Sequence, residues 1–157
     1  MTATRSISSS ASLFRIALFA AATSLAGYIA YKYATGLHAT SGFYAFMFPL
    51  SALLAAAGIV LAVKPEKACD CGTTMRAGVA ALSVLWLVTG VMCVGALSQS
   101  VMTHPAIGLA ATFQMLTQHV FLSLSLIAFA WAPQRLVRAL SAGPTAQAPN
   151  LPGTAAT

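Results

Sequence analysis

The side chains best suited to chemistry in this chain lie in its longest apolar stretch. His119 sits near the middle of the segment between residues 105 and 132, and Gln114 and Gln118 accompany it. Lipid cannot satisfy an imidazole and two amides, so we expect this segment to be the best buried of the chain. An ionisable side chain at such depth is a candidate functional group. A single hydrogen bond to a neighbouring helix would account for His119 equally well.

Trp86, from another apolar segment, and the polar residues of this segment together suggest a cofactor site. Trp86, Gln114, Gln118 and His119 could hydrogen-bond the head group of a quinone, or His119 could supply one axial ligand to haem b. A haem held by two histidines of this chain is disfavoured, because His119 is the one histidine at mid-depth. These four residues are the predicted cofactor-binding set.

The two cysteines at positions 69 and 71 form a Cys-x-Cys motif in a loop between apolar segments. Two thiolates can bind a soft ion such as Cu(I) or Hg(II), whereas a closed zinc site needs four ligands, which one loop does not provide. The alternative is a pair of incidental cysteines in an exposed loop. The motif therefore makes metal binding a hypothesis that needs further ligands.

Further soft ligands occur along the chain and suggest a path for a thiophilic metal ion. Imidazole, thioether and thiolate groups all suit copper and related metals. The predicted metal ligands are His38, Met102, His104, Met115, His119, Cys69 and Cys71. Between His119 and the cysteines the expected path offers only hydroxyl groups such as Ser123 and Ser125, so it contains a gap.

The elements that must position these residues are four apolar segments. The chain is 59% hydrophobic and only 6% charged, far below the roughly 25% of a soluble domain. A bilayer core needs about 20 apolar residues in a helix, and segments near residues 13–34, 43–63, 77–97 and 105–132 qualify. We therefore predict an all-α integral membrane protein, an up-down-up-down bundle of four transmembrane helices with short loops.

Charged residues predict how the bundle is threaded. Seven of the eight basic residues flank the N-terminus, the loop between the second and third spans, or the C-terminus, and Lys32 is the exception. The positive-inside rule then places both termini in the cytoplasm, with residues 1–12 as a cytoplasmic flank. Residues 133–157 are expected to form a basic flank and a disordered tail. A bacterial inner membrane is predicted. The Ser-rich, acid-free N-terminus leaves an organellar inner membrane as the alternative.

The same composition excludes several functions. The two acids, Glu66 and Asp70, lie outside the spans, so no carboxylate pair for acid-base catalysis can form within them. Basic residues occur singly at the ends of apolar runs, which excludes nucleic acid as a partner. The leading prediction is a non-catalytic small subunit or assembly partner of a membrane complex, in contact with lipid and with other subunits or further copies. Soft-metal transport and haem or quinone association are the alternatives.

Overall fold

A computed structural model describes residues 3–36 and 42–141 of the chain. Within these ranges the regular secondary structure is helical and contains no strand, which confirms the predicted all-α class. Four helical segments are long and apolar enough to cross a membrane. They are Ala11–Ala34, Ala45–Val63, Thr73–Met92 and Pro105–Trp131. The expected number of spans is therefore confirmed at the level of length and composition.

The first two helices, α1 (Ala3–Ala34) and α2 (Gly42–Val63), form the most extensively packed pair. α1 begins ten residues before the expected span, since neither Gly nor Pro interrupts the chain before Gly27. Close approach depends on Gly58 in α2, where a Cβ atom would lie 2.9 Å from the Ala22 Cβ. Small residues at a helix contact allow backbones to approach in this way.

The third predicted span, 77–97, is divided between two helices. α4 (Thr73–Met92) follows the short α3 (Pro65–Cys69), and α5 (Val94–Thr103) follows α4. Cys93 separates α4 from α5, and its backbone N–H contacts the carbonyls of Thr89 and Gly90. Hydropathy contains no signal for this break, because all the flanking residues are uncharged.

The fourth span contains an irregularity of a different kind. α6 (Pro105–Met115) continues into a π-helical turn, η2 (Leu116–Phe121), and then into α7 (Leu122–Trp131). His104 is the N-cap of α6 and Pro105 its first residue, a position that suits proline. The π turn contains Gln118 and His119, two of the predicted site residues.

The segment that follows the fourth span, expected to be a basic flank, is helical. α8 (Pro133–Ser141) begins directly after α7. Its Val137 and Leu140 side chains are buried, and the helix contacts α1, α3 and α7. Burial of these two apolar side chains explains why the helix forms next to the bundle. Residues 142–157 lie outside the described part of the chain.

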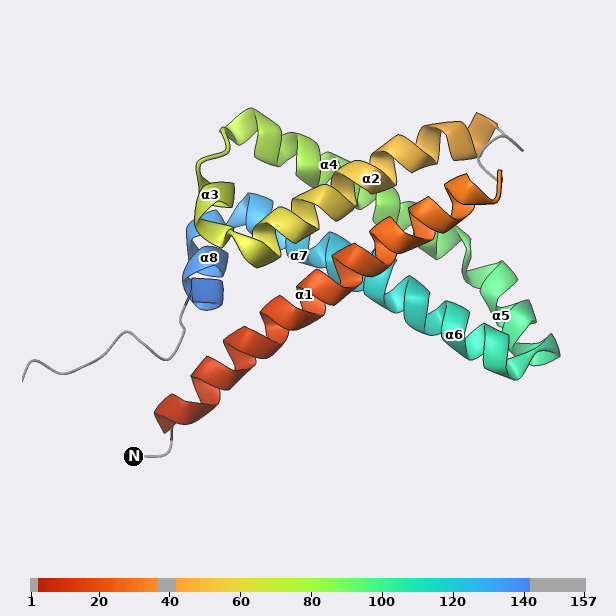
Figure 1. The fold of residues 1–157 in the computed structure, drawn as a ribbon, viewed down its shortest axis with the longest axis horizontal. Coiled ribbons are helices and arrows are strands. Elements are labelled where there is room, and N and C mark those ends of the chain that lie inside the picture. The colour runs from red at the N-terminus through yellow and green to blue at the C-terminus, as the bar shows by residue number, and fades with distance from the viewer. Residues whose placement is uncertain (1–2, 37–41, 142–157) are drawn as a thin grey trace, which may run out of the picture.

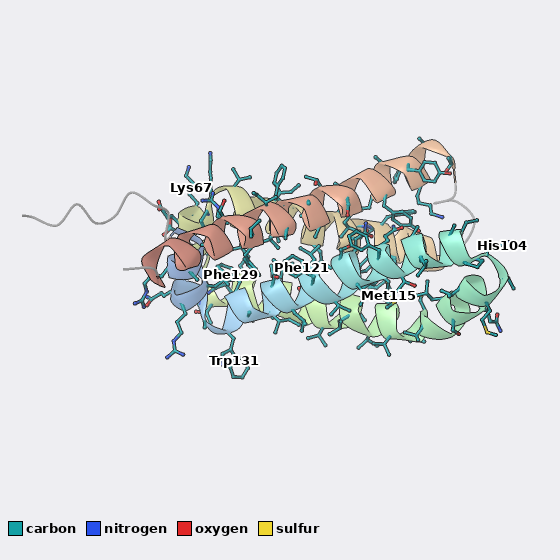
Figure 2. All side chains as sticks on the ribbon, turned by 90° about the horizontal axis from the view of Figure 1, so that it is seen from below. Lys67, His104, Met115, Phe121, Phe129 and Trp131 are labelled. Atoms are coloured by element: carbon teal, nitrogen blue, oxygen red, sulfur yellow. The ribbon has the colours of Figure 1, made fainter. Side chains whose placement is uncertain are left out.

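The helices cross near the middle of the molecule, and α3 and α8 lie together at one end (Figure 1). The turn between α5 and α6 forms the other end. Side chains labelled in Figure 2 mark this division, with Lys67 and Trp131 at the α3–α8 end and His104 at the opposite end. The buried core runs between them and contains Leu18, Leu54 and Leu122.

Candidate functional site: a cavity between the helices

A cavity of about 410 Å³ lies between α1, α2, α4, the start of α5, α6 and η2. All four predicted cofactor-binding residues line it, together with Met115. Its volume falls in the range of about 300–1,000 Å³ that is usual for small-molecule sites. Lining residues absent from the predicted site are Tyr28, Met47, Phe48, Ser51, Thr89, Cys93, Leu97 and Ala111.

Trp86 and His119 form the centre of this cavity. Their rings are stacked with centroids 4.4 Å apart and planes 8° from parallel. Gly90, one turn after Trp86 in α4, makes the arrangement possible, because a Cβ atom there would lie 2.6 Å from the His119 Cβ. A glycine is thus required where η2 crosses α4. The tryptophan covers one face of the imidazole and leaves its edge for other contacts.

The π turn also takes part in this contact. The Trp86 indole N–H donates a hydrogen bond of 3.1 Å to the main-chain carbonyl of Gln118. At the end of the turn, the Leu122 N–H bonds to the Thr117 carbonyl, five residues back, as a π-helix requires. Such turns occur often at functional sites, and this one holds His119 against α4.

A chain of amide hydrogen bonds joins the same region to α1. The Gln114 amide nitrogen donates to the Gln118 side-chain oxygen over 3.3 Å, and the Gln118 amide nitrogen donates to the Ser24 hydroxyl over 3.0 Å. Gln118 is only 2% exposed. Because both ends of its amide are bonded, Gln118 acts mainly as a link between helices. Gln114 is half-buried and lines the cavity beside it.

His119 retains an unused hydrogen-bonding group. Its Nδ1 atom is buried and has no hydrogen-bond partner among the described residues. Buried polar atoms are nearly always paired, by protein or by another molecule. His119 and Gln114 both line the cavity, so a bound molecule would find hydrogen-bonding side chains on its wall.

The predicted metal ligands are spread over the length of the molecule. Cys69 ends α3 and Cys71 follows it, at the end opposite to Met102 and His104, which are exposed. Met115 and His119 lie between these groups and share the cavity. His38 lies outside the described residues. Where the chain is described, no group of three or more His, Cys, Asp or Glu residues could hold a metal ion.

The described lining of the cavity contains no carboxylate, lysine or arginine. It offers aromatic surfaces from Trp86 and Phe48, hydrogen-bonding groups from Gln114 and His119, and the Cys93 thiol. These groups can hold and orient a largely apolar molecule that carries a polar head. Comparisons with protein-family models, with characterised proteins and with solved structures find no match for this chain.

Proposed function

We propose that this protein is a four-span integral membrane protein without catalytic activity that holds a lipophilic molecule of the quinone class beside His119. One observation carries the proposal: Trp86 of α4 lines the same cavity as Gln114, Gln118 and His119 of the fourth span. The cavity is largely apolar, with a few polar groups that converge, which is the usual composition of a small-molecule site.

The shape and chemistry of a quinone match the lining. A flat ring can lie against the Trp86 and Phe48 side chains, and its carbonyl oxygens can accept hydrogen bonds from the Gln114 amide or the His119 ring. Tyr28 and Cys93 are exposed lining residues, so the cavity opens to the surface of the molecule. In a bilayer that surface faces lipid, from which a lipophilic molecule would enter.

The proposed membrane arrangement is the predicted up-down-up-down bundle, in a bacterial inner membrane with both termini in the cytoplasm. Four apolar helices support the insertion. Basic residues support the orientation, since Lys64 and Lys67 lie at the same end as α8, while Lys32 is near the other end of α1. An organellar inner membrane is the alternative location, and the same helices would span it.

We place this binding role in a small subunit or assembly partner of a membrane complex. Large apolar side chains such as Phe46, Leu53 and Phe113 are strongly exposed, at 59%, 60% and 71%. Lipid, other subunits or another copy of the chain would cover them. Copurification of further subunits at fixed stoichiometry from mild detergent would support the assembly role, and a pure monomer with bound quinone would argue against it.

A thiophilic ion such as Cu(I) is a second candidate ligand, favoured by the sulfur atoms in the lining. Met47, Cys93 and Met115 join His119 around the cavity. Cys93 directly follows α4, about one turn beyond Gly90, and Met115 lies one turn before His119. Because α4–α5 and α6–α7 form a hairpin that turns at His104 (Figure 1), both residues are displaced from the Gly90–His119 contact toward the same end.

The quinone proposal can be tested by the fluorescence of Trp86. In a Trp131→Phe background, Trp86 is the sole tryptophan, because the chain has two. Titration of the protein in nanodiscs with decylubiquinone should quench Trp86 saturably. His119→Gln should weaken the apparent affinity by about tenfold, as expected for loss of one buried hydrogen bond. The matched variant His104→Gln, at the end of the bundle, should bind as the parent does.

Unsaturable quenching that is equal in both histidine variants would contradict a specific site. Absorbance supplies the haem test, since a Soret band lost in His119→Ala would identify haem as the cofactor instead. Copper analysis separates the second candidate: Cu(I) lost with Cys93→Ser but retained with Cys69→Ser would identify a soft-metal site in the cavity.

A further inference from the structure

The end of the molecule opposite His104 carries an excess of positive charge. Its described basic residues are Arg15, Lys64, Lys67, Arg76, Arg135 and Arg138. The chain has only two acids, Glu66 and Asp70, and both lie at this end. In the part of the chain that the structure describes, no ion pair joins either acid to these residues. This end therefore presents cationic groups that the protein itself does not neutralise.

Two short helices build the surface that displays these charges. In α8, Val137 and Leu140 face the bundle and are buried, whereas Arg135 and Arg138 are exposed. In α3, Pro65 and Ala68 are buried and Lys67 is exposed. α3 and α8 contact each other across the end of the bundle (Figure 1). We refer to residues 65–69 and 133–141 together as the α3–α8 cap.

The basic residues differ in how far they are already occupied. The Arg15 guanidinium donates to the carbonyls of Ala62 and Val63, over 3.1 and 3.4 Å, and so satisfies the end of α2. Arg138 bonds through Nε to the Gln134 carbonyl of its own helix, over 3.3 Å, which leaves its terminal nitrogens for other partners. Lys67, Arg135 and Arg138 of the cap, with Lys64 directly before it, are exposed and keep charged nitrogen atoms available to an anion.

The position of Trp131 indicates the level at which the cap lies. This side chain is 90% exposed and sits at the end of α7, two residues before α8 begins. Tryptophan is enriched at the boundary between hydrocarbon and head groups. If Trp131 occupies that boundary, the charged face of α8 lies at the depth of the phosphate groups. Lipid phosphate groups are already located at that depth, whereas a soluble phosphate ion would have to bind from bulk water. The arrangement therefore favours a lipid phosphate as the ligand.

We propose that the α3–α8 cap binds the phosphate groups of anionic phospholipids through Lys67, Arg135 and Arg138. Arginine can donate two parallel hydrogen bonds to a phosphate, and lysine adds a compact positive charge. The inference rests on the membrane insertion proposed above, but not on the ligand of the cavity. It gives the protein a lipid preference in addition to a direction of insertion.

The test compares lipids that copurify with the protein. Full-length protein is reconstituted in equal amounts of phosphatidylcholine and phosphatidylglycerol, then extracted and washed in mild detergent, and its retained lipids are quantified by mass spectrometry. The parent should be enriched in phosphatidylglycerol. Each basic residue near a membrane surface changes lipid affinity by about fivefold, so Arg135→Gln with Arg138→Gln should reduce the enrichment by at least that factor.

Two control variants make the result specific. Lys32→Gln removes one positive charge near the opposite end of α1 and should leave the enrichment unchanged. Arg135→Lys with Arg138→Lys keeps the charge and the fold, and should retain most of the enrichment. Loss of enrichment in the Gln pair but not in the Lys pair would support the cap as the binding surface.

Three outcomes would overturn the inference. These are equal retention of both lipids by the parent, equal loss in Lys32→Gln, and displacement of the lipid by inorganic phosphate at physiological concentration. If enrichment fails while Trp86 still reports saturable quinone binding, only the lipid inference is wrong. If the protein does not float with vesicles at all, the proposed membrane insertion is wrong as well.

Discussion

The Trp86 indole lies almost parallel to the His119 imidazole, with ring centroids 4.4 Å apart and planes 8° from parallel. The same indole donates its N–H to the main-chain carbonyl of Gln118, the residue before His119. One side chain of α4 therefore contacts both the backbone and a side chain of the π turn. This double contact aligns α4 with η2 and sets the edge of the cavity.

Gly90→Ala tests the close approach that this stack requires. The new methyl group would lie 2.6 Å from the His119 Cβ, so the helices must separate or the histidine must move. We expect a net loss of about 1–3 kcal/mol, as for other overpacked sites, measured as a lower unfolding temperature in detergent. Gly78→Ala, where nothing lies within 4 Å, should be neutral or stabilising through helix propensity. Equal effects of the two substitutions would contradict the packing described here.

Trp86→Phe tests the indole hydrogen bond while an aromatic ring is kept at the position. Loss of the donor to the Gln118 carbonyl should cost about 1 kcal/mol, with an additional loss from the smaller ring. Chemical unfolding in mixed micelles would measure it. Trp131→Phe is the matched control, because Trp131 is 90% exposed, and it should change stability by only a few tenths of a kcal/mol. A larger effect at Trp131 than at Trp86 would be inconsistent with this arrangement.

The hydrogen bond between Gln118 and Ser24 can be measured by a double-mutant cycle. Gln118→Leu and Ser24→Ala each remove one partner of the 3.0 Å contact between η2 and α1. Hydrogen bonds between transmembrane helices average about 0.6 kcal/mol and reach about 1.7 kcal/mol, so a coupling energy in that range is expected. A coupling of zero would show that the two substitutions act independently. Gln99→Leu, at an exposed position of α5, should show no coupling to Ser24→Ala.

The threading of the chain predicts which ends can be labelled from outside. In a background with the other cysteines replaced by serine, Met102→Cys should react with a membrane-impermeant maleimide on intact cells. Cys71 alone should react only after the cells are permeabilised. Met102 is 86% exposed and lies near the α5–α6 turn, whereas Cys71 follows α3 at the opposite end. The reverse labelling pattern would invert the proposed orientation.

Several features could be predicted from the sequence because they depend on local properties. A nearly uncharged apolar chain must form helices wherever it contacts lipid, since only a helix satisfies the backbone within one segment. The number of apolar helices follows from the lengths of the uncharged runs. The start of α6 at Pro105 also follows from the sequence, because proline suits the first turn of a helix and disrupts its interior.

Other features depend on contacts between segments and were decided only by the tertiary structure. Nothing local to Trp86 or His119 predicts that they stack, because the contact needs Gly90 to set the distance between two helices. The π turn at residues 116–121 is similar, since the Trp86 indole from another helix bonds to its backbone. Composition fixes which segments are helical, whereas side-chain shape at the crossings fixes how the helices meet, and the cavity beside His119 exists only through those crossings.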